Sequence, residues 1–480
     1  MSAQAVAEER FRSSGPGRVA LVASYAALGV SLVASRTVGI GQSFWTDEIT
    51  AVEEFIRAGP SEILGGRNLS HELYGLLAWL TSTVVGESEI ALRLWSVLPF
   101  IAGVALVTAW LHERMGALSA LAYLFLATVS PLLLDITRQA RGYGLVFLAM
   151  SVLVVAGLEA RRSRRTVALL AFCAGGIAGT MTLPQFGIAF VAAGAVLLGV
   201  APLRRRTAGF LAISLVAIAV FYAPHLGEVR DASRIEDGVQ IDTLWLLTAP
   251  IDQVLLPALI WIDGTALVAG VVWLPAVLGA LLVMAYSPLA RRPSTALLLG
   301  AGPVATVVVL WLGQAYVIPR YLSYLLVPLF VLLATGAAAL PERVATRSAL
   351  VPATLCVVVA AVLAIRFVEL APELMRLPRE ANRDAAEAVL AREPPPRSVL
   401  AFMRNPRNLE HYLGRQVVLL SAGEVSDRVC ASAEPVAYVT QPFAIPRVEL
   451  ACLGRPGVEH YRFQQYARGG EMNVWLVPPS

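Results

Sequence analysis

An acidic pair follows the first long apolar segment of the chain. Asp47 and Glu48 come shortly after Trp45 and a few residues beyond the apolar run 19–38, which is long enough to cross a bilayer. The pair therefore stands where the chain leaves the membrane. Carboxylates that are poorly solvated on one side can act as bases or cation ligands, whereas a simpler interpretation is the polar end of a helix. Which interpretation holds depends on the residues that could contact Asp47 and Glu48.

Arginine and tyrosine side chains recur in two later connections that we place on the same side of the membrane. One connection contains Arg138, Arg141 and Tyr143, and the other contains Arg320 and Tyr321. Guanidinium groups can hold a phosphate and stabilise charge on a departing one, while a carboxylate takes the proton of an acceptor hydroxyl. This pattern predicts displacement at a sugar anomeric carbon with a lipid phosphate as leaving group. Alternatively, the arginines reach lipid headgroups and the tyrosines form an aromatic belt.

Further polar residues begin the segment 71–86. Its apolar part is too short for a span, and its apolar side chains fall on one side, so we expect an amphipathic helix at the outer surface. His71, Glu72 and Tyr74 are site candidates there, although a histidine on a surface helix is more often simply tolerated. A divalent cation stays open as a cofactor, because the spacings are too few to define a metal site. Its ligands would come from Asp47, Glu48 and His71.

The composition assigns the chain to the polytopic membrane proteins. It has 480 residues, of which 57% are hydrophobic and 15% charged, and its mean hydropathy is +0.67. A soluble globular protein of this size does not have such values. The net charge of +4 is small, so nothing in the composition indicates nucleic-acid binding.

Arginine placement gives the predicted topology, because cytoplasmic loops are enriched in arginine. If 71–86 does not span, the arginine clusters and the N-terminal segment 1–18 all lie inside. Long loops 39–90 and 225–264 then lie outside. We therefore predict an all-α polytopic domain, 19–368, with its N-terminus inside. The eleven predicted spans are 19–38, 91–111, 117–133, 143–159, 166–182, 186–201, 207–224, 265–286, 295–313, 321–340 and 349–368.

The polar tail predicts a small second domain outside the membrane. A linking segment, 369–396, contains a helical stalk at about 378–392 and ends in three prolines. Beyond it, 397–480 reads as a compact α/β domain. We expect a helix at 405–413 and strands at 398–402, 416–420, 436–440 and 473–477. Cys430 and Cys452 could pair if this tail is extracytoplasmic.

The order of short motifs along the chain resembles a known family. The sequence is similar to GT-C fold glycosyltransferases of the protein-mannosyltransferase and aminoarabinose-transferase type, also described as glycosyltransferase family 39-like. The resemblance covers about 19–340. It is carried by Trp45-Thr46-Asp47-Glu48, His71-Glu72-Leu73-Tyr74, Gly86-Glu87-Ser88-Glu89 with Arg93-Leu94, Ser130-Pro131, Arg138-Gln139-Ala140-Arg141-Gly142-Tyr143 and Pro319-Arg320-Tyr321.

The resemblance implies a polyprenyl-phosphate sugar donor, inversion at the anomeric carbon and an outward-facing active site. Asp47 would be the catalytic base or acceptor contact, with Glu48 as its catalytic neighbour. The donor phosphate would be held by Arg138, Arg141 and Arg320. Many members carry His-Pro-Pro-Leu-Tyr, whereas here His71 is followed by Glu72 and no proline. Some members use a divalent cation and others do not.

We therefore predict a glycosyltransferase of a bacterial plasma membrane, with its active site and C-terminus outside. It would move a mannose-like or arabinose-like sugar to an envelope lipid, glycan or protein. One alternative is a lipid-linked oligosaccharide flippase or a polymer ligase. A flippase would need ionisable side chains along several spans, whereas the cores 166–182, 186–201, 207–224, 295–313 and 349–364 contain none apart from Cys173, Tyr222 and Cys356. Another alternative is a non-catalytic scaffold whose outer charges could be replaced without loss.

Overall fold

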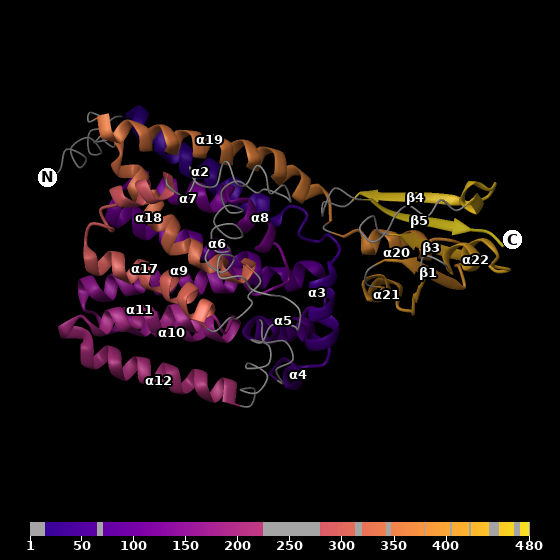
Figure 1. Ribbon diagram of the computed structural model, residues 1–480, viewed down its shortest axis with the longest axis horizontal. Coiled ribbons are helices and arrows are strands. Elements are labelled where there is room, and N and C mark those ends of the chain that lie inside the picture. The colour runs from indigo at the N-terminus through magenta and orange to yellow at the C-terminus, as the bar shows by residue number, and fades with distance from the viewer. Residues whose placement is uncertain are drawn as a thin grey trace.

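The protein is an elongated molecule with a helical bundle at one end and a small domain built on a sheet at the other (Figure 1). The computed structural model describes residues 15–64, 71–223, 279–312, 319–341, 347–378, 380–403, 406–421, 424–440, 451–464 and 471–479. The predicted loop 225–264, most of the N-terminal segment and the first part of the run 265–286 lie outside the described residues.

Long helices form where the sequence has apolar runs, because a continuous apolar segment is stable as a helix in lipid. The bundle contains α2 (Gly15–Thr37), α6 (Glu89–Met115), α7 (Ala117–Val129), α9 (Tyr143–Ser163), α10 (Thr166–Thr182), α11 (Phe186–Leu198), α12 (Arg204–Tyr222), α17 (Pro293–Leu312), α18 (Leu326–Ala339) and α19 (Arg347–Arg376). Six helices of the described part are long and apolar enough to cross a membrane, which is the pattern of a membrane protein. The count of eleven spans and their sidedness stay predictions.

The bundle is packed around α9, which lies between α6 and α10. A Cβ atom at Gly144 would lie 1.7 Å from the Ser96 carbonyl oxygen of α6, so only glycine permits this approach. One turn further, the Phe100 and Phe147 rings meet edge to face at 4.7 Å. This close contact fixes where the N-terminal end of α9, and the loop before it, lie against α6.

Short elements gather at the end of the bundle that faces the second domain (Figure 1). They are α3 (Thr46–Ala51), η1 (Val52–Ile56), α4 (Pro60–Leu64), α5 (Glu72–Val84), α8 (Pro131–Ile136) and η5 (Pro319–Leu325); η2 (Ala201–Leu203) lies between α11 and α12. The helix expected within 71–86 is therefore present as α5. It buries Tyr74, Gly75 and Ala78, while Leu80 and Val84 are exposed on its outer side. An outward apolar side fits the predicted position at the membrane surface.

The C-terminal unit is a mixed five-stranded sheet with helices on both faces. The strand order is β2-β1-β3-β5-β4, with β1 parallel to β2 and β3, and β5 antiparallel to β3 and β4. Its elements are α20 (Asn382–Leu390), β1 (Ser398–Phe402), α21 (Arg407–Leu413), β2 (Val418–Leu419), α22 (Glu424–Cys430), β3 (Val436–Thr440), η7 (Ala451–Gly454), β4 (Glu459–Gln464) and β5 (Glu471–Val477). Successive residues of β1 enter opposite layers, with Val399 packed beside α20 and Leu400 beside α22.

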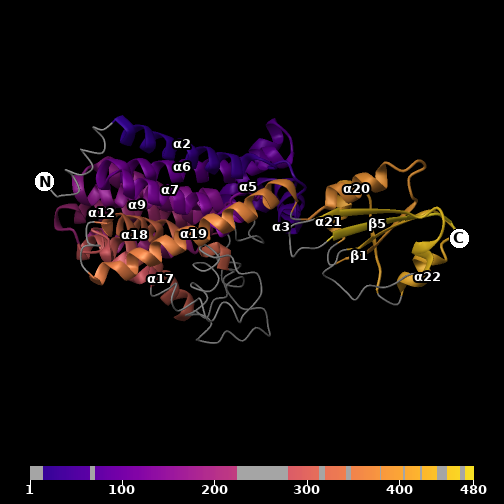
Figure 2. The same cartoon turned by 90° about the horizontal axis from the view of Figure 1, so that it is seen from above.

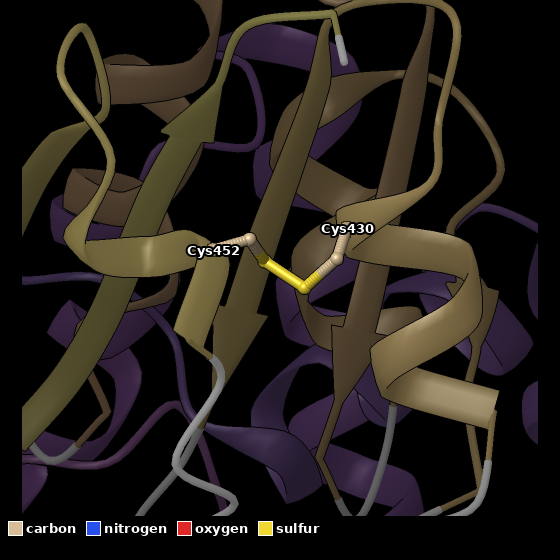
Figure 3. Close-up of a disulfide and its surroundings, with 2 residues drawn as sticks. All are labelled: Cys430 and Cys452. Atoms are coloured by element: carbon tan, nitrogen blue, oxygen red, sulfur yellow. A yellow bond between two sulfur atoms is a disulfide. The ribbon is translucent and has the colours of Figure 1, made fainter.

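Two features of this unit differ from the expectation. The helix expected as a stalk is α20, and Ala385, Ala386 and Val389 pack it into the core of the sheet. The polar strand β4 was not expected, because its side chains are largely exposed and give no apolar signal. Cys430 at the end of α22 and Cys452 of η7 form a disulfide beside the sheet (Figure 3). The bond links α22 to η7 on one face of the sheet.

Candidate functional site

Asp47 lies between two arginines from distant parts of the chain. Its Oδ2 atom is 2.8 Å from Nη1 of Arg141, in the loop before α9, and also accepts from Nη2 of Arg320 in η5. The Asp47 side chain is 28% exposed and that of Arg141 is 9% exposed, so the group is sheltered but reachable. The structure thus brings together three of the residues selected from the sequence, and their two positive charges exceed the one negative charge.

Aromatic rings surround this group of charges. The guanidinium carbon of Arg320 lies 5.1 Å from the centre of the Trp45 ring, and Nη2 of Arg141 donates to the Tyr321 hydroxyl at 3.4 Å. The His71 ring meets the Tyr143 ring edge to face at 4.9 Å and the Tyr321 ring at 5.7 Å. We call Asp47, Arg141, Arg320 and these rings the charged cluster. The charged cluster thus combines three charged groups with aromatic ring edges and tyrosine hydroxyl groups.

His71 and Glu72 are buried beside the charged cluster. Both ring nitrogens of His71 and both carboxylate oxygens of Glu72 have no hydrogen-bond partner among the described residues. Burial, with Arg141 and Arg320 nearby, holds the pKa of His71 well below its ordinary value. Burial raises the pKa of Glu72 to about 8, and the backbone N–H of Glu72 and the nearby Tyr222 hydroxyl offset only part of this effect. At neutral pH the site therefore contains a neutral imidazole and a largely protonated carboxyl group.

The backbone around His71 is held closely. His71 has a φ of 80° and precedes α5, and its N–H donates to the carbonyl oxygen of Thr182 at 2.6 Å. A Cβ atom at Gly142 would lie 2.8 Å from Nδ1 of His71, so a larger residue there would displace the His71 ring. Tyr74 points elsewhere: its hydroxyl donates to the Leu92 carbonyl oxygen at 3.3 Å and links α5 to α6.

Glu48 faces away from the charged cluster and binds Arg93 of α6. Arg93 donates to the two carboxylate oxygens of Glu48 at 2.9 and 2.7 Å, and the pair is almost wholly buried. Glu48 also accepts from the N–H groups of Trp45, at 3.1 Å, and Ala140. One carboxylate thus joins the start of α3 to α6 and to the loop that carries Arg141.

Arg93 holds this part of the site together, and the sequence analysis named it only within a motif and not as a site candidate. It donates three further hydrogen bonds, at 2.8, 2.6 and 3.1 Å, to the carbonyl oxygens of Ile40, Gln42 and Ser43. The available signal was an arginine inside the apolar run 91–111, since a charge in a predicted span usually has a buried partner.

Arg138 does not lie with Arg141 and Arg320. Its guanidinium group donates to the carbonyl oxygens of Ser35 and Val38 at 3.0 and 2.9 Å. These are carbonyl groups at the C-terminal end of α2, where a cation is favourable. The two arginines of the same loop therefore serve different parts of the molecule.

The charged cluster suits an anion. Within the described ranges, no three His, Cys, Asp or Glu side chains lie close enough together to hold a metal ion. Asp47 faces two guanidinium groups, while Glu48 is occupied by Arg93. Two converging guanidinium groups with excess positive charge match the oxygens of a phosphate.

Known structures with the same fold include enzymes that handle lipid phosphates. ArnT from Cupriavidus metallidurans in the apo state aligns with 96% of this chain and 98% of its own, with a TM-score of 0.54 and 14% identity. The same protein bound to undecaprenyl phosphate aligns equally far, with a TM-score of 0.51 and 14% identity. The archaeal oligosaccharyltransferase AglB from Archaeoglobus fulgidus, in complex with an inhibitory peptide and a dolichol-phosphate, has a TM-score of 0.51 and 11% identity. That alignment covers 85% of this chain and 65% of AglB.

These likenesses establish the fold. ArnT, an aminoarabinose transferase, and AglB are both GT-C fold glycosyltransferases, so the resemblance predicted from the motifs is confirmed. No protein-family model and no curated protein sequence matches the chain.

Proposed function

We propose that the protein is an integral-membrane glycosyltransferase that takes its sugar from a lipid-phosphate donor. The observation that carries this proposal is the Asp47 carboxylate held between Arg141 and Arg320. The fold supports it, because structures of two proteins with this fold contain undecaprenyl phosphate and a dolichol-phosphate. The C-terminal domain and the charged cluster would face outward from a bacterial plasma membrane.

The two arginines would bind the donor phosphate. A phosphate presents oxygens to guanidinium groups as a carboxylate does, so it can take over the contacts that Asp47 makes in the structure. Arg141 and Arg320 then stabilise the charge that collects on the phosphate as it leaves. Arg138 would support α2 instead.

Asp47, displaced from the arginines by the donor, would act as the base. It accepts the proton of an acceptor hydroxyl while the hydroxyl oxygen forms a bond to the sugar anomeric carbon. The bond from that carbon to the phosphate oxygen breaks, and its electron pair leaves with the lipid phosphate. Attack from the side opposite the leaving group inverts the configuration at the anomeric carbon. Glu48 keeps Asp47 in place through its contacts with Arg93.

The sugar would lie against the rings of the charged cluster. The Tyr143 hydroxyl and both His71 nitrogens lack partners among the described residues, so they can meet sugar hydroxyl groups. A mannose-like or arabinose-like sugar is the proposal, and the acceptor is an envelope lipid, glycan or protein.

The proposal is tested by a transfer assay with labelled polyprenyl-phosphate mannose and arabinose as donors and an envelope extract as acceptor. The assay measures the release of polyprenyl phosphate. Asp47→Asn should lower transfer by at least about 100-fold. Arg320→Ala should raise KM for the donor. Glu54→Gln removes an exposed acid that pairs with Arg407 and is the matched control. Full transfer by folded Asp47→Asn would exclude Asp47 as the base, and movement of the donor across the bilayer without transfer would favour a flippase.

A further inference from the structure

The C-terminal domain contacts the segment that carries Asp47. It extends beyond the end of the bundle, next to α3 (Figures 1 and 2). We propose that Glu380, Asn408 and Tyr412 are positioning residues that hold Asp47 in its reactive place. The idea rests on the proposed function of Asp47 and extends it to a domain that does not carry the charged cluster.

Glu380, in the connection just before α20, is the centre of the contact. Its carboxylate accepts from the Thr46 hydroxyl at 3.0 and 3.2 Å, and from the side-chain amides of Asn382 and Asn408 at 3.0 and 2.9 Å. Asn408 also donates to the Thr46 hydroxyl oxygen at 2.7 Å. Thr46 is the first residue of α3 and the neighbour of Asp47. The domain therefore binds the chain one residue away from the proposed base.

The preceding segment is held in the same way. The Phe44 N–H donates to the Tyr412 hydroxyl at 2.6 Å, and that hydroxyl donates to Oε1 of Glu89 at 3.1 Å. Arg383 donates to the Gly41 carbonyl oxygen at 3.0 Å, and the Ser43 hydroxyl donates to the backbone carbonyl of Glu380.

Residues 42–45 form neither helix nor strand, so their backbone polar groups need side-chain partners. Arg93 and Glu48 supply partners from the bundle, and Tyr412 and Asn382 supply further partners from the C-terminal domain. Asn382 and Asn408 are buried in this contact, being 0% and 2% exposed. The segment before Asp47 is thus held from two sides, one of which belongs to the separate domain.

The contact contains two kinds of interaction, exposed ion pairs at its edge and buried hydrogen bonds at its centre. Ion pairs at the edge of the contact, such as Arg407 with Glu54, are 65% and 45% exposed and contribute little. The buried polar groups instead converge on Phe44 and Thr46. Arg141 and Arg320 belong to the bundle, so the distance from Asp47 to the phosphate site depends partly on the C-terminal domain. An error of about 1 Å in such a distance can cost roughly 100-fold in rate.

Variants at the contact test the proposal. Glu380→Ala and Thr46→Val should each lower kcat for donor turnover by about 10- to 100-fold, with KM for the donor changed less than about threefold. Thr46→Ser keeps the hydroxyl and should restore kcat. Arg407→Ala, in the exposed pair across the same contact, is the matched control and should turn over like the unaltered protein. Hydrogen exchange in the peptide spanning 41–51 should rise in Glu380→Ala and Thr46→Val only.

The possible results are distinguishable. Unaltered kcat and unaltered exchange in Glu380→Ala and Thr46→Val would overturn the proposal, as would a fall in kcat that Thr46→Ser shares. If Glu380→Ala fails to fold, the same measurements of kcat and hydrogen exchange on Thr46→Val and Tyr412→Phe test the proposal. If the unaltered protein transfers no sugar, the proposed function fails, and the exchange measurement still shows whether Glu380 holds this segment.

Discussion

Replacing Arg93 by methionine should destabilise the bundle strongly. The substitution keeps an apolar stem of similar length but leaves the Glu48 carboxylate, which is 0% exposed, without its cation. It also removes the donor to three backbone carbonyl groups. Removing one partner of a buried ion pair costs about 3–5 kcal/mol, because the remaining charge stays buried. The cost for the exposed pair of Arg57 and Glu87, whose side chains are 46% and 34% exposed, should be about 0–1 kcal/mol.

Denaturant unfolding in detergent, followed by tryptophan fluorescence, compares Arg93→Met with the control Arg57→Met. We expect the free energy of unfolding to fall by at least about 2 kcal/mol more in Arg93→Met than in the control. The double variant Glu48→Leu, Arg93→Met should recover part of the loss, since it no longer buries an unpaired charge. Equal losses in Arg93→Met and Arg57→Met, or no recovery in the double variant, would refute this reasoning.

Three further predictions follow from other contacts. The raised pKa of Glu72, about 8 in the fold against an ordinary 4.5, means that stability falls as pH rises through this interval. Glu72→Gln should remove that fall and gain up to about 4 kcal/mol at pH 8, while a pH dependence like that of the unaltered protein would contradict the assignment. Arg138→Ala should lower the melting temperature without raising KM for the donor; a raised KM would return Arg138 to the phosphate site. Replacing Cys430 and Cys452 by serine should cost the C-terminal domain about 3 kcal/mol, because the bond closes a loop with a sequence separation of 22, and an unchanged unfolding midpoint would argue against this role.

The helices of the bundle were predictable because lipid demands continuous apolar segments. The helix expected at 166–182 is α10, Thr166–Thr182, and the short run after His71 is α5. Apolar patterning could not locate β4, because most side chains of this strand are polar and exposed. Apolar patterning reports burial, so it locates elements that are buried along their length.

The residue types of the candidate site could be predicted from the sequence. Which carboxylate contacts which arginine could not. Adjacent residues at a helix start point in different directions, so Asp47 meets Arg141 and Arg320 while Glu48 meets Arg93. Sequence spacing could not show this, because Arg93 stands 45 positions from Glu48. Likewise, residues 137–142 form no continuous helix, so a spacing of three does not place two arginines on one side. The contacts of the C-terminal domain were beyond prediction, because they join residues more than 300 positions apart.

Two glycines restrict which substitutions the loop before α9 and the start of this helix can accept. Gly142 and Gly144 flank Tyr143, and a single added carbon would meet the Thr182 methyl group at 2.5 Å in one case and the Ser96 carbonyl oxygen in the other. A side chain at position 144 would push α9 away from α6 and take Arg141 with it, because the Ser96 backbone cannot give way. In distant relatives Gly144 should therefore be kept, because the atom that it faces belongs to the backbone of α6, whereas a larger residue at Gly142 would need a smaller one at position 182 or 71.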